Sequence, residues 1–79
     1  MTSNQTEKAQ LIQDFYGIKI SELKPILKLR HGFELFGTDD GYFFLSDGDR
    51  CQSMEDHEYN CTASKLCTWN ASTKQFERI

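Results

Sequence analysis

The fold is decided by the stretch Leu27-Lys28-Leu29-Arg30-His31-Gly32-Phe33-Glu34-Leu35. Apolar and polar side chains alternate along it with a period of two, which is typical of strands with one buried face. A three-residue loop over residues 30–32 keeps the apolar side chains together, because it pairs Leu29 with Phe33 and Leu27 with Leu35. The stretch therefore predicts a β-hairpin with Gly32 in a left-handed conformation. A single long strand through Gly32 preserves the same alternation and is the alternative.

Further strands are expected after this hairpin. Residues 42–45, Tyr-Phe-Phe-Leu, carry large apolar side chains on both faces, so we expect a central strand that is covered on both sides. The pair Asp47-Gly48 is typical of a two-residue hairpin turn leading into a strand at residues 50–54. Residues 55–65 have no clear period and are predicted to be a loop or a short helix. In a last hairpin, a four-residue loop sets Trp69 opposite Phe76.

A helix is expected before the first hairpin, over residues 8–16. Its apolar side chains recur at helical spacing and predict one buried face: Leu11, Ile12, Phe15 and Tyr16. Gly17 occupies the position of a C-cap glycine. Asn4 and Glu7 have the spacing of a capping box at the other end of the helix.

These elements predict one α+β domain over residues 1–79, an N-terminal helix packed on a small antiparallel β-meander of four to six strands. Residues 1–4 are expected to be a flexible tail. Phe36 and Phe44 are expected to point away from the helix and to need a second cover. That cover is either the C-terminal hairpin or another copy of the protein.

Composition narrows the class of partner. The net charge is −3, which argues against direct nucleic-acid binding, since such domains are usually basic. No apolar run approaches the roughly 18 residues of a membrane span, so no membrane partner is expected. The N-terminal residues have neither the basic nor the apolar region of a secretory signal, so we expect the protein to be located in the reducing cytoplasm.

The acidic residues are concentrated in the middle of the chain. Residues 38–60 hold seven carboxylates against the single cation Arg50. In an antiparallel meander, the turn at residues 39–40 and the segment after strand 50–54 meet at the same edge of the sheet. We expect a negative edge there, flanked by two tyrosines, that binds a partner with a basic surface. The predicted partner-binding residues are Asp39, Asp40, Glu55, Asp56, Glu58, Tyr42 and Tyr59.

Cysteine and histidine offer a weaker alternative, a zinc-stabilised domain. Its four candidate ligands are Cys51, His57, Cys61 and Cys67. Zinc sites usually draw two thiolates from one tight turn, as in Cys-x2-Cys, and this spacing is absent here. We therefore expect no metal and no other cofactor.

Catalysis is not expected either. The chain has no Gly-x-Ser-x-Gly elbow and no cysteine-protease signature. Its five glycines are isolated, so it also has no glycine-rich loop that could bind a phosphate. In size, acidity and lack of catalytic residues it is similar to small phage inhibitors, including anti-CRISPR proteins, which block nucleic-acid-handling machinery by occupying basic surfaces. The leading hypothesis is therefore a non-enzymatic protein-interaction module of this type. The second hypothesis is a structural homodimer or other homo-oligomer subunit that buries Phe36, Phe44 and Trp69.

Overall fold

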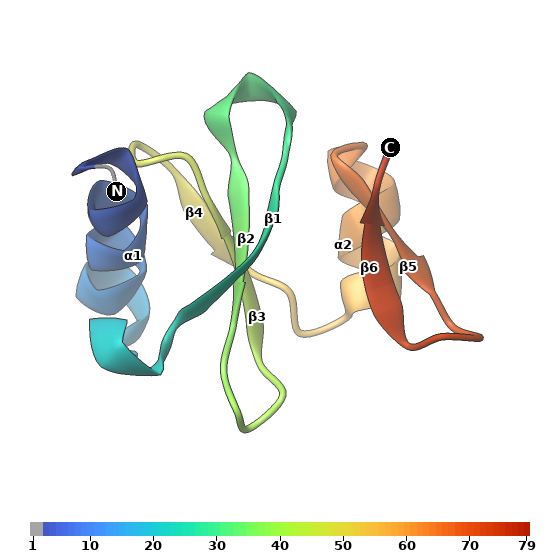
Figure 1. The fold of residues 1–79 in the computed structure, drawn as a ribbon, viewed down its shortest axis with the longest axis horizontal. Coiled ribbons are helices and arrows are strands. Elements are labelled where there is room, and N and C mark those ends of the chain that lie inside the picture. The colour runs from blue at the N-terminus through green and yellow to red at the C-terminus, as the bar shows by residue number, and fades with distance from the viewer. Residues whose placement is uncertain (1–2) are drawn as a thin grey trace.

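The computed structural model describes residues 3–79, and the elements form three layers (Figure 1). The first layer is the helix α1 (Ser3–Tyr16), followed by a 3-10 turn, η1 (Ile20–Glu22). The middle layer is an antiparallel sheet in the order β1-β2-β3-β4. Its strands are β1 (Lys24–Lys28), β2 (Glu34–Gly37), β3 (Phe43–Ser46) and β4 (Cys51–Ser53), with a second 3-10 turn, η2 (Arg30–Gly32), between β1 and β2. The third layer holds α2 (His57–Ser64) and the hairpin of β5 (Cys67–Asn70) and β6 (Gln75–Arg78).

The predicted α+β class and antiparallel meander are confirmed, and so is the first hairpin. Leu27 pairs with Leu35, and the backbone N–H of Leu29 donates to the carbonyl oxygen of Phe33 at 2.8 Å. Gly32 has φ 77°, as the three-residue loop requires, and His31 is also left-handed at φ 60°. The alternative of one long strand is wrong.

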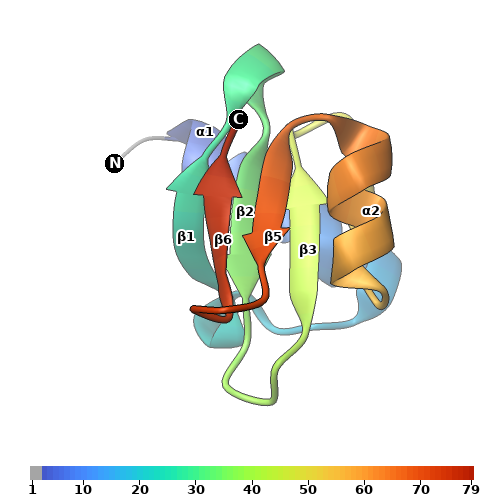
Figure 2. The same cartoon turned by 90° about the vertical axis from the view of Figure 1, so that its right-hand side faces the viewer.

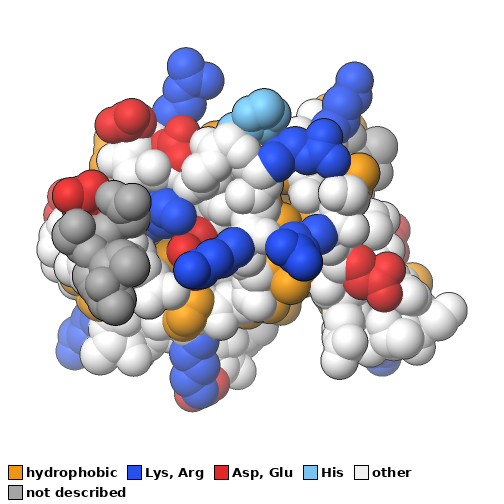
Figure 3. Space-filling model, turned by 45° about the horizontal axis from the view of Figure 1, so that its top comes forward, with side chains coloured by type: hydrophobic (Ala, Val, Ile, Leu, Met, Phe, Trp, Pro, Cys, Tyr) orange, Lys and Arg blue, Asp and Glu red, His pale blue; other side chains and the backbone are white. Residues whose placement is uncertain are grey.

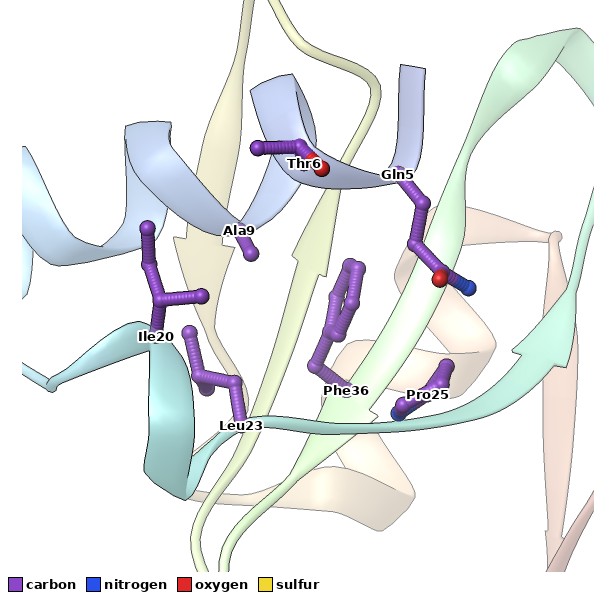
Figure 4. A pocket seen from close by; sticks show the side chains of 7 residues that line it. All are labelled: Gln5, Thr6, Ala9, Ile20, Leu23, Pro25 and Phe36. Atoms are coloured by element: carbon purple, nitrogen blue, oxygen red, sulfur yellow. The ribbon is translucent and has the colours of Figure 1, made fainter. Parts of the chain in front are cut away.

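The two faces of the sheet are covered in the opposite way from our expectation. Phe36 and Phe44 face α1 and pack with Ala9, Ile12 and Leu23. Figure 4 shows the ring of Phe36 lying between α1 and the strands. Phe36 also lines a small hollow of about 110 Å³ there. The expectation failed because both parities of β2 and β3 are apolar, so alternation alone does not tell which face the helix covers.

The buried face of α1 also differs from the predicted one. Ala9 and Ile12 lie in the core, whereas the side chain of Phe15 is 70% exposed. Tyr16 is only partly covered and packs its ring against Phe44, with 5.3 Å between the centroids. The small side chain of Ala9 suits a contact surface close to the sheet, which the apolar pattern of larger residues did not indicate.

The second face of the sheet is covered by α2 and the C-terminal hairpin. In Figure 2 the hairpin lies in front of β1 and β2, and α2 lies beside β3. Trp69 pairs with Phe76 across a four-residue loop, as predicted. β3 is central and buried on both faces, which is also confirmed. The core beneath this layer consists of seven buried side chains: Leu35, Leu45, Met54, Cys61, Leu66, Cys67 and Phe76.

The turn between β3 and β4 departs from the sequence prediction. Ser46 pairs with Cys51, so the β3–β4 loop is two residues longer than an Asp47-Gly48 turn. The Oδ1 atom of Asp47 organises the longer loop, since it accepts hydrogen bonds from the backbone N–H groups of Asp49 and Arg50. Burial acts to raise the pKa of Asp47, but these hydrogen bonds and the charge of Arg50 outweigh burial and lower the pKa.

The ends of α1 give a mixed result. Gly17 has φ 74° and donates its N–H to the carbonyl of Gln13, so the C-cap prediction is confirmed. The helix begins at Ser3, which places Asn4 inside its first turn and not at the N-cap. Ser3 and Asn4 also belong to the segment 1–4 that was expected to be a tail, while residues 1–2 lie outside the described residues.

Both edges of the sheet are modified. On β1, the pairing with β2 shifts between Pro25 and Leu27, which leaves Ile26 as a bulge. On β4, the backbone N–H of Ser53 donates to the hydroxyl of Tyr16 at 3.1 Å. The side-chain amide of Asn60 donates to the carbonyl of the same serine at 3.4 Å. Side chains from both helices therefore occupy hydrogen-bonding groups of the β4 edge.

One charged side chain is buried under α1. Glu34, on the same face of β2 as Phe36, is 2% exposed. Its carboxylate accepts hydrogen bonds from Gln5 at 2.9 Å and from Lys8 at 3.3 Å. Opposite it, the Ser46 hydroxyl donates to the backbone carbonyl of Lys8 at 3.0 Å. This polar cluster fixes the position of α1 along the sheet, because a buried carboxylate must keep its partners.

We predict that Glu34→Leu lowers the free energy of unfolding by about 1–3 kcal/mol, since it leaves the Lys8 ammonium group in a poorly hydrated position without this carboxylate. Glu55→Leu, at an exposed glutamate, is the control and should change stability by less than about 0.5 kcal/mol. Adding Lys8→Met to Glu34→Leu should recover part of the loss. Urea unfolding measures all three variants, and equal losses for Glu34→Leu and Glu55→Leu would contradict the role of the cluster.

Candidate functional site

Tyr42 stands between two surface hollows at the end of the sheet where β2 turns into β3. The first, which we name the Glu55 hollow, measures about 170 Å³. The residues around it are Gly41, Tyr42, Phe43, Ser53, Met54, Glu55 and His57. The second, the Asp40 hollow, measures about 280 Å³. It is lined by Ile18, Glu22, Thr38, Asp39, Asp40 and Tyr42.

The β2–β3 turn explains why these side chains project from the sheet. The N–H of Thr38 donates to the carbonyl of Tyr42 at 2.9 Å, and the Thr38 hydroxyl oxygen accepts from the N–H of Tyr42 at 3.2 Å. The N–H of Gly41, at φ 91°, donates to the carbonyl of Thr38. These bonds close a tight turn with Asp39 and Asp40 at its tip and Tyr42 at its base.

Glu55 reaches the same end of the sheet from the neighbouring strand. The N–H of Met54 donates to the carbonyl of Phe43 at 2.8 Å, so the pairing of β3 with β4 continues beyond Ser53. Glu55 then follows directly and lines the hollow beside Tyr42. The structure thus brings together four of the seven residues predicted to bind a partner: Asp39, Asp40, Tyr42 and Glu55. We call this surface, together with Glu22, the acidic end.

The other three predicted residues belong to the start of α2. Asp56 is the N-cap, and its side chain accepts the backbone N–H of Tyr59 at 3.2 Å. Glu58 and Tyr59 are exposed on the first turn of the helix, and Tyr59 is 67% exposed. They adjoin the acidic end through His57 and Glu55, but neither residue lines a hollow beside Tyr42.

Two residues at the acidic end were not predicted to belong to it. Glu22 lines the Asp40 hollow from η1, and no sequence pattern relates this turn to residues 38–40. His57 lines the Glu55 hollow, although the sequence indicated it only as a metal ligand. Its ring packs in an aromatic cluster, with centroids 4.1 Å from Trp69 and 5.7 Å from both Phe43 and Phe76.

The four residues of the zinc alternative do not converge. Cys51 packs with the core under α1, where its sulfur lies 3.9 Å from the carbonyl oxygen of Leu11. Cys61 and Cys67 lie in the core on the other face of the sheet. Among the side chains that the structure describes, no group of three or more His, Cys, Asp or Glu residues is placed to hold a metal ion.

The surface expected for a homodimer is also altered. Phe36 is 1% exposed and Phe44 is 3% exposed within a single chain, so α1 already covers both side chains. Trp69 is half-buried in the aromatic cluster of the third layer. Phe36 and Phe44 therefore have almost no exposed surface that a second copy could cover.

Comparison with known proteins finds no family model, no curated protein and no solved structure that matches this chain. Within residues 3–79, neither helix has the length and apolar character needed to cross a membrane. At the acidic end, exposed charge, the exposed ring of Tyr42 and two hollows lie side by side.

Asp56 must be separated from the other acidic residues in any mutational test. We predict that Asp56→Ala lowers the free energy of unfolding by about 1 kcal/mol, because the N-cap acceptor of α2 is lost. Asp56→Asn should stay within about 0.5 kcal/mol of the wild type, since asparagine caps helices equally well. Thermal unfolding of the two variants measures the difference. Equal stability of Asp56→Ala and wild type would show that the cap contributes nothing.

Proposed function

We propose that this chain is a non-enzymatic protein-interaction module that docks its acidic end on a basic surface of a protein partner. One observation carries the proposal. Tyr42 is 56% exposed and forms a wall of both hollows, while exposed Glu22, Asp39, Asp40 and Glu55 surround it. Exposed tyrosines with charged neighbours are frequent anchors of protein interfaces, because one ring supplies both apolar area and a hydroxyl group.

The chemistry of the Glu55 hollow fits a lysine or arginine side chain of the partner. Its lining combines one carboxylate with the rings of Tyr42, Phe43 and His57. A cation gains from an aromatic face as well as from a carboxylate, by about 0.5–2 kcal/mol when the contact excludes water. The aliphatic stem of the same side chain would cover part of the exposed ring of Tyr42.

The carboxylates at the acidic end are available to a partner at little cost. Asp39 forms an ion pair with Lys24 at 2.6 Å, but both side chains are mostly exposed, 83% and 64% respectively. Such surface pairs contribute about 0–1 kcal/mol, so a cation of the partner can replace Lys24 without a large penalty. Among the interactions described for Asp40 and Glu55, none is an ion pair within the chain.

The charge distribution supports a preferred orientation of approach. Exposed Lys28, Arg30 and Arg78 lie toward the other end of the molecule, around the β1–β2 hairpin. Asp47 and Asp49 of the β3–β4 loop lie at this end too, so its charge is mixed. Figure 3 shows Lys and Arg side chains gathered in the middle of the face that includes this end, with Asp and Glu side chains between them. A molecule that is negative at one end and more positive at the other turns its acidic end toward a basic surface before contact.

Proteins that bind nucleic acid present such basic surfaces, and a module that covers one of them acts as an inhibitor. This is the partner class that we propose, in line with the similarity of the chain in size and acidity to small phage inhibitors such as anti-CRISPR proteins. The partner is a protein in this proposal, and the chain itself makes no contact with nucleic acid or membrane.

The test is a capture experiment from lysate of the source organism at low and high salt, followed by affinity measurement with the purified partner. The site variant carries Asp39→Asn, Asp40→Asn and Glu55→Gln. The control variant carries Glu7→Gln, Asp49→Asn and Glu77→Gln, which removes the same number of charges from exposed positions elsewhere. We expect the site variant to lose at least about tenfold in affinity, or 1.4 kcal/mol, and the control to lose much less.

Tyr42→Ala provides an independent measurement. We expect it to weaken binding by about tenfold without changing the salt dependence, since a neutral anchor is removed. Equal losses in the site and control variants would reduce the effect to net charge and contradict docking through this face. A partner with no basic surface, bound equally at high salt, would overturn the proposal.

A further inference from the structure

Two thiols meet in the core of the third layer. The sulfur atoms of Cys61 and Cys67 are 3.3 Å apart, and the two residues are 1% and 0% exposed. Cys61 lies in α2 and Cys67 begins β5, so the contact joins the helix to the C-terminal hairpin. Both cysteines are in the free thiol form in this structure.

The backbone between the two cysteines is held in a defined turn. Lys65 has φ 57° and ends α2, and its N–H donates to the carbonyl of Cys61 at 3.1 Å. The Ser64 hydroxyl donates to the same carbonyl and accepts from the N–H of Leu66. The two cysteines therefore face each other because the turn brings them back together, and their sulfurs need to approach by only about 1 Å to reach disulfide length.

We propose that Cys61 and Cys67 form an intramolecular disulfide when the chain encounters a low-molecular-weight disulfide such as oxidised glutathione. One thiolate attacks the glutathione disulfide and releases one glutathione thiol, giving a mixed disulfide. The second thiolate displaces the remaining glutathione. Overall the protein loses two hydrogens, one S–S bond forms, and one S–S bond of glutathione is reduced to two thiols.

The location of the pair determines when this exchange takes place. Burial, together with the hydrogen bond and charge interaction with Cys67, raises the pKa of Cys61 to about 12, and burial also raises the pKa of Cys67. Thiolate is the reactive species, so the closed native form exchanges slowly. The bond forms during folding, or when the third layer opens. Once formed it resists reduction, because burial keeps attacking thiolates away from the two sulfur atoms. Cys51 lies in the other core and takes no part.

The test is refolding of the reduced full chain with and without oxidised glutathione, followed by alkylation and tryptic mapping under non-reducing conditions. Trypsin cleaves after Arg50, Lys65 and Lys74, which separates Cys61 from Cys67. We expect peptides 51–65 and 66–74 to be recovered as a linked pair. Cys51→Ser should give the same linked pair, which assigns the bond to Cys61, because residue 61 is then the only cysteine left in the first peptide.

Thermal unfolding supplies a second readout. We expect the oxidised chain to unfold about 5–15 °C higher than the reduced chain, because the bond restricts the unfolded state. Cys67→Ser should show no difference between the two conditions. Separate peptides from wild-type and Cys51→Ser protein, or a linked pair that disappears in Cys51→Ser, would overturn the proposal, even if the single variants at positions 61 and 67 fail to fold.

Discussion

The rest of the structure depends on one constraint, the burial of both faces of β2 and β3. Phe36 and Phe44 point to one side and Leu35 and Leu45 to the other. A four-stranded sheet with two apolar faces needs a cover on each face. The N-terminal helix takes one face, and α2 with the C-terminal hairpin takes the other (Figure 1).

This arrangement determines where binding can occur. Both faces of the sheet are occupied by the core, so exposed functional groups are left to the outer layers and to the ends of the strands. The β2–β3 turn and the segment after β4 meet at one end, where Tyr42 and Glu55 line the same hollow. Because these residues lie in turns, they can carry charge without a cost to the core, and the acidic end is compatible with the stability of the fold.

The sequence predicts the hairpins well because their pairing is local. Leu27 with Leu35 and Trp69 with Phe76 follow from alternation and loop length. The face of the sheet covered by each end of the chain could not be predicted, because both parities are apolar. Glu34 illustrates the same difficulty: it shares the parity of exposed Lys28, yet α1 buries it by supplying Lys8 and Gln5.

The candidate site was predictable to a similar extent. Meander topology is enough to place Asp39 and Asp40 near Glu55, since adjacent antiparallel strands share their ends. Glu22 required knowledge of how η1 folds back along the β2–β3 turn, which no local pattern supplies. The position of His57 depends on the contact between the third layer and the sheet. In each case the missing information is long-range packing.

The modified edges of the four-stranded sheet, β1 and β4, have a consequence for association between molecules. Along β1, Pro25 has no N–H to offer, the bulge at Ile26 interrupts the regular backbone spacing, and Lys24 and Lys28 place charge beside the strand. Along β4, Tyr16 and Asn60 occupy backbone groups of Ser53. A further strand from another molecule therefore meets an obstacle on either side. Both edges of the four-stranded sheet thus carry features that disfavour edge-to-edge pairing between molecules, the kind of pairing from which fibrous aggregates grow.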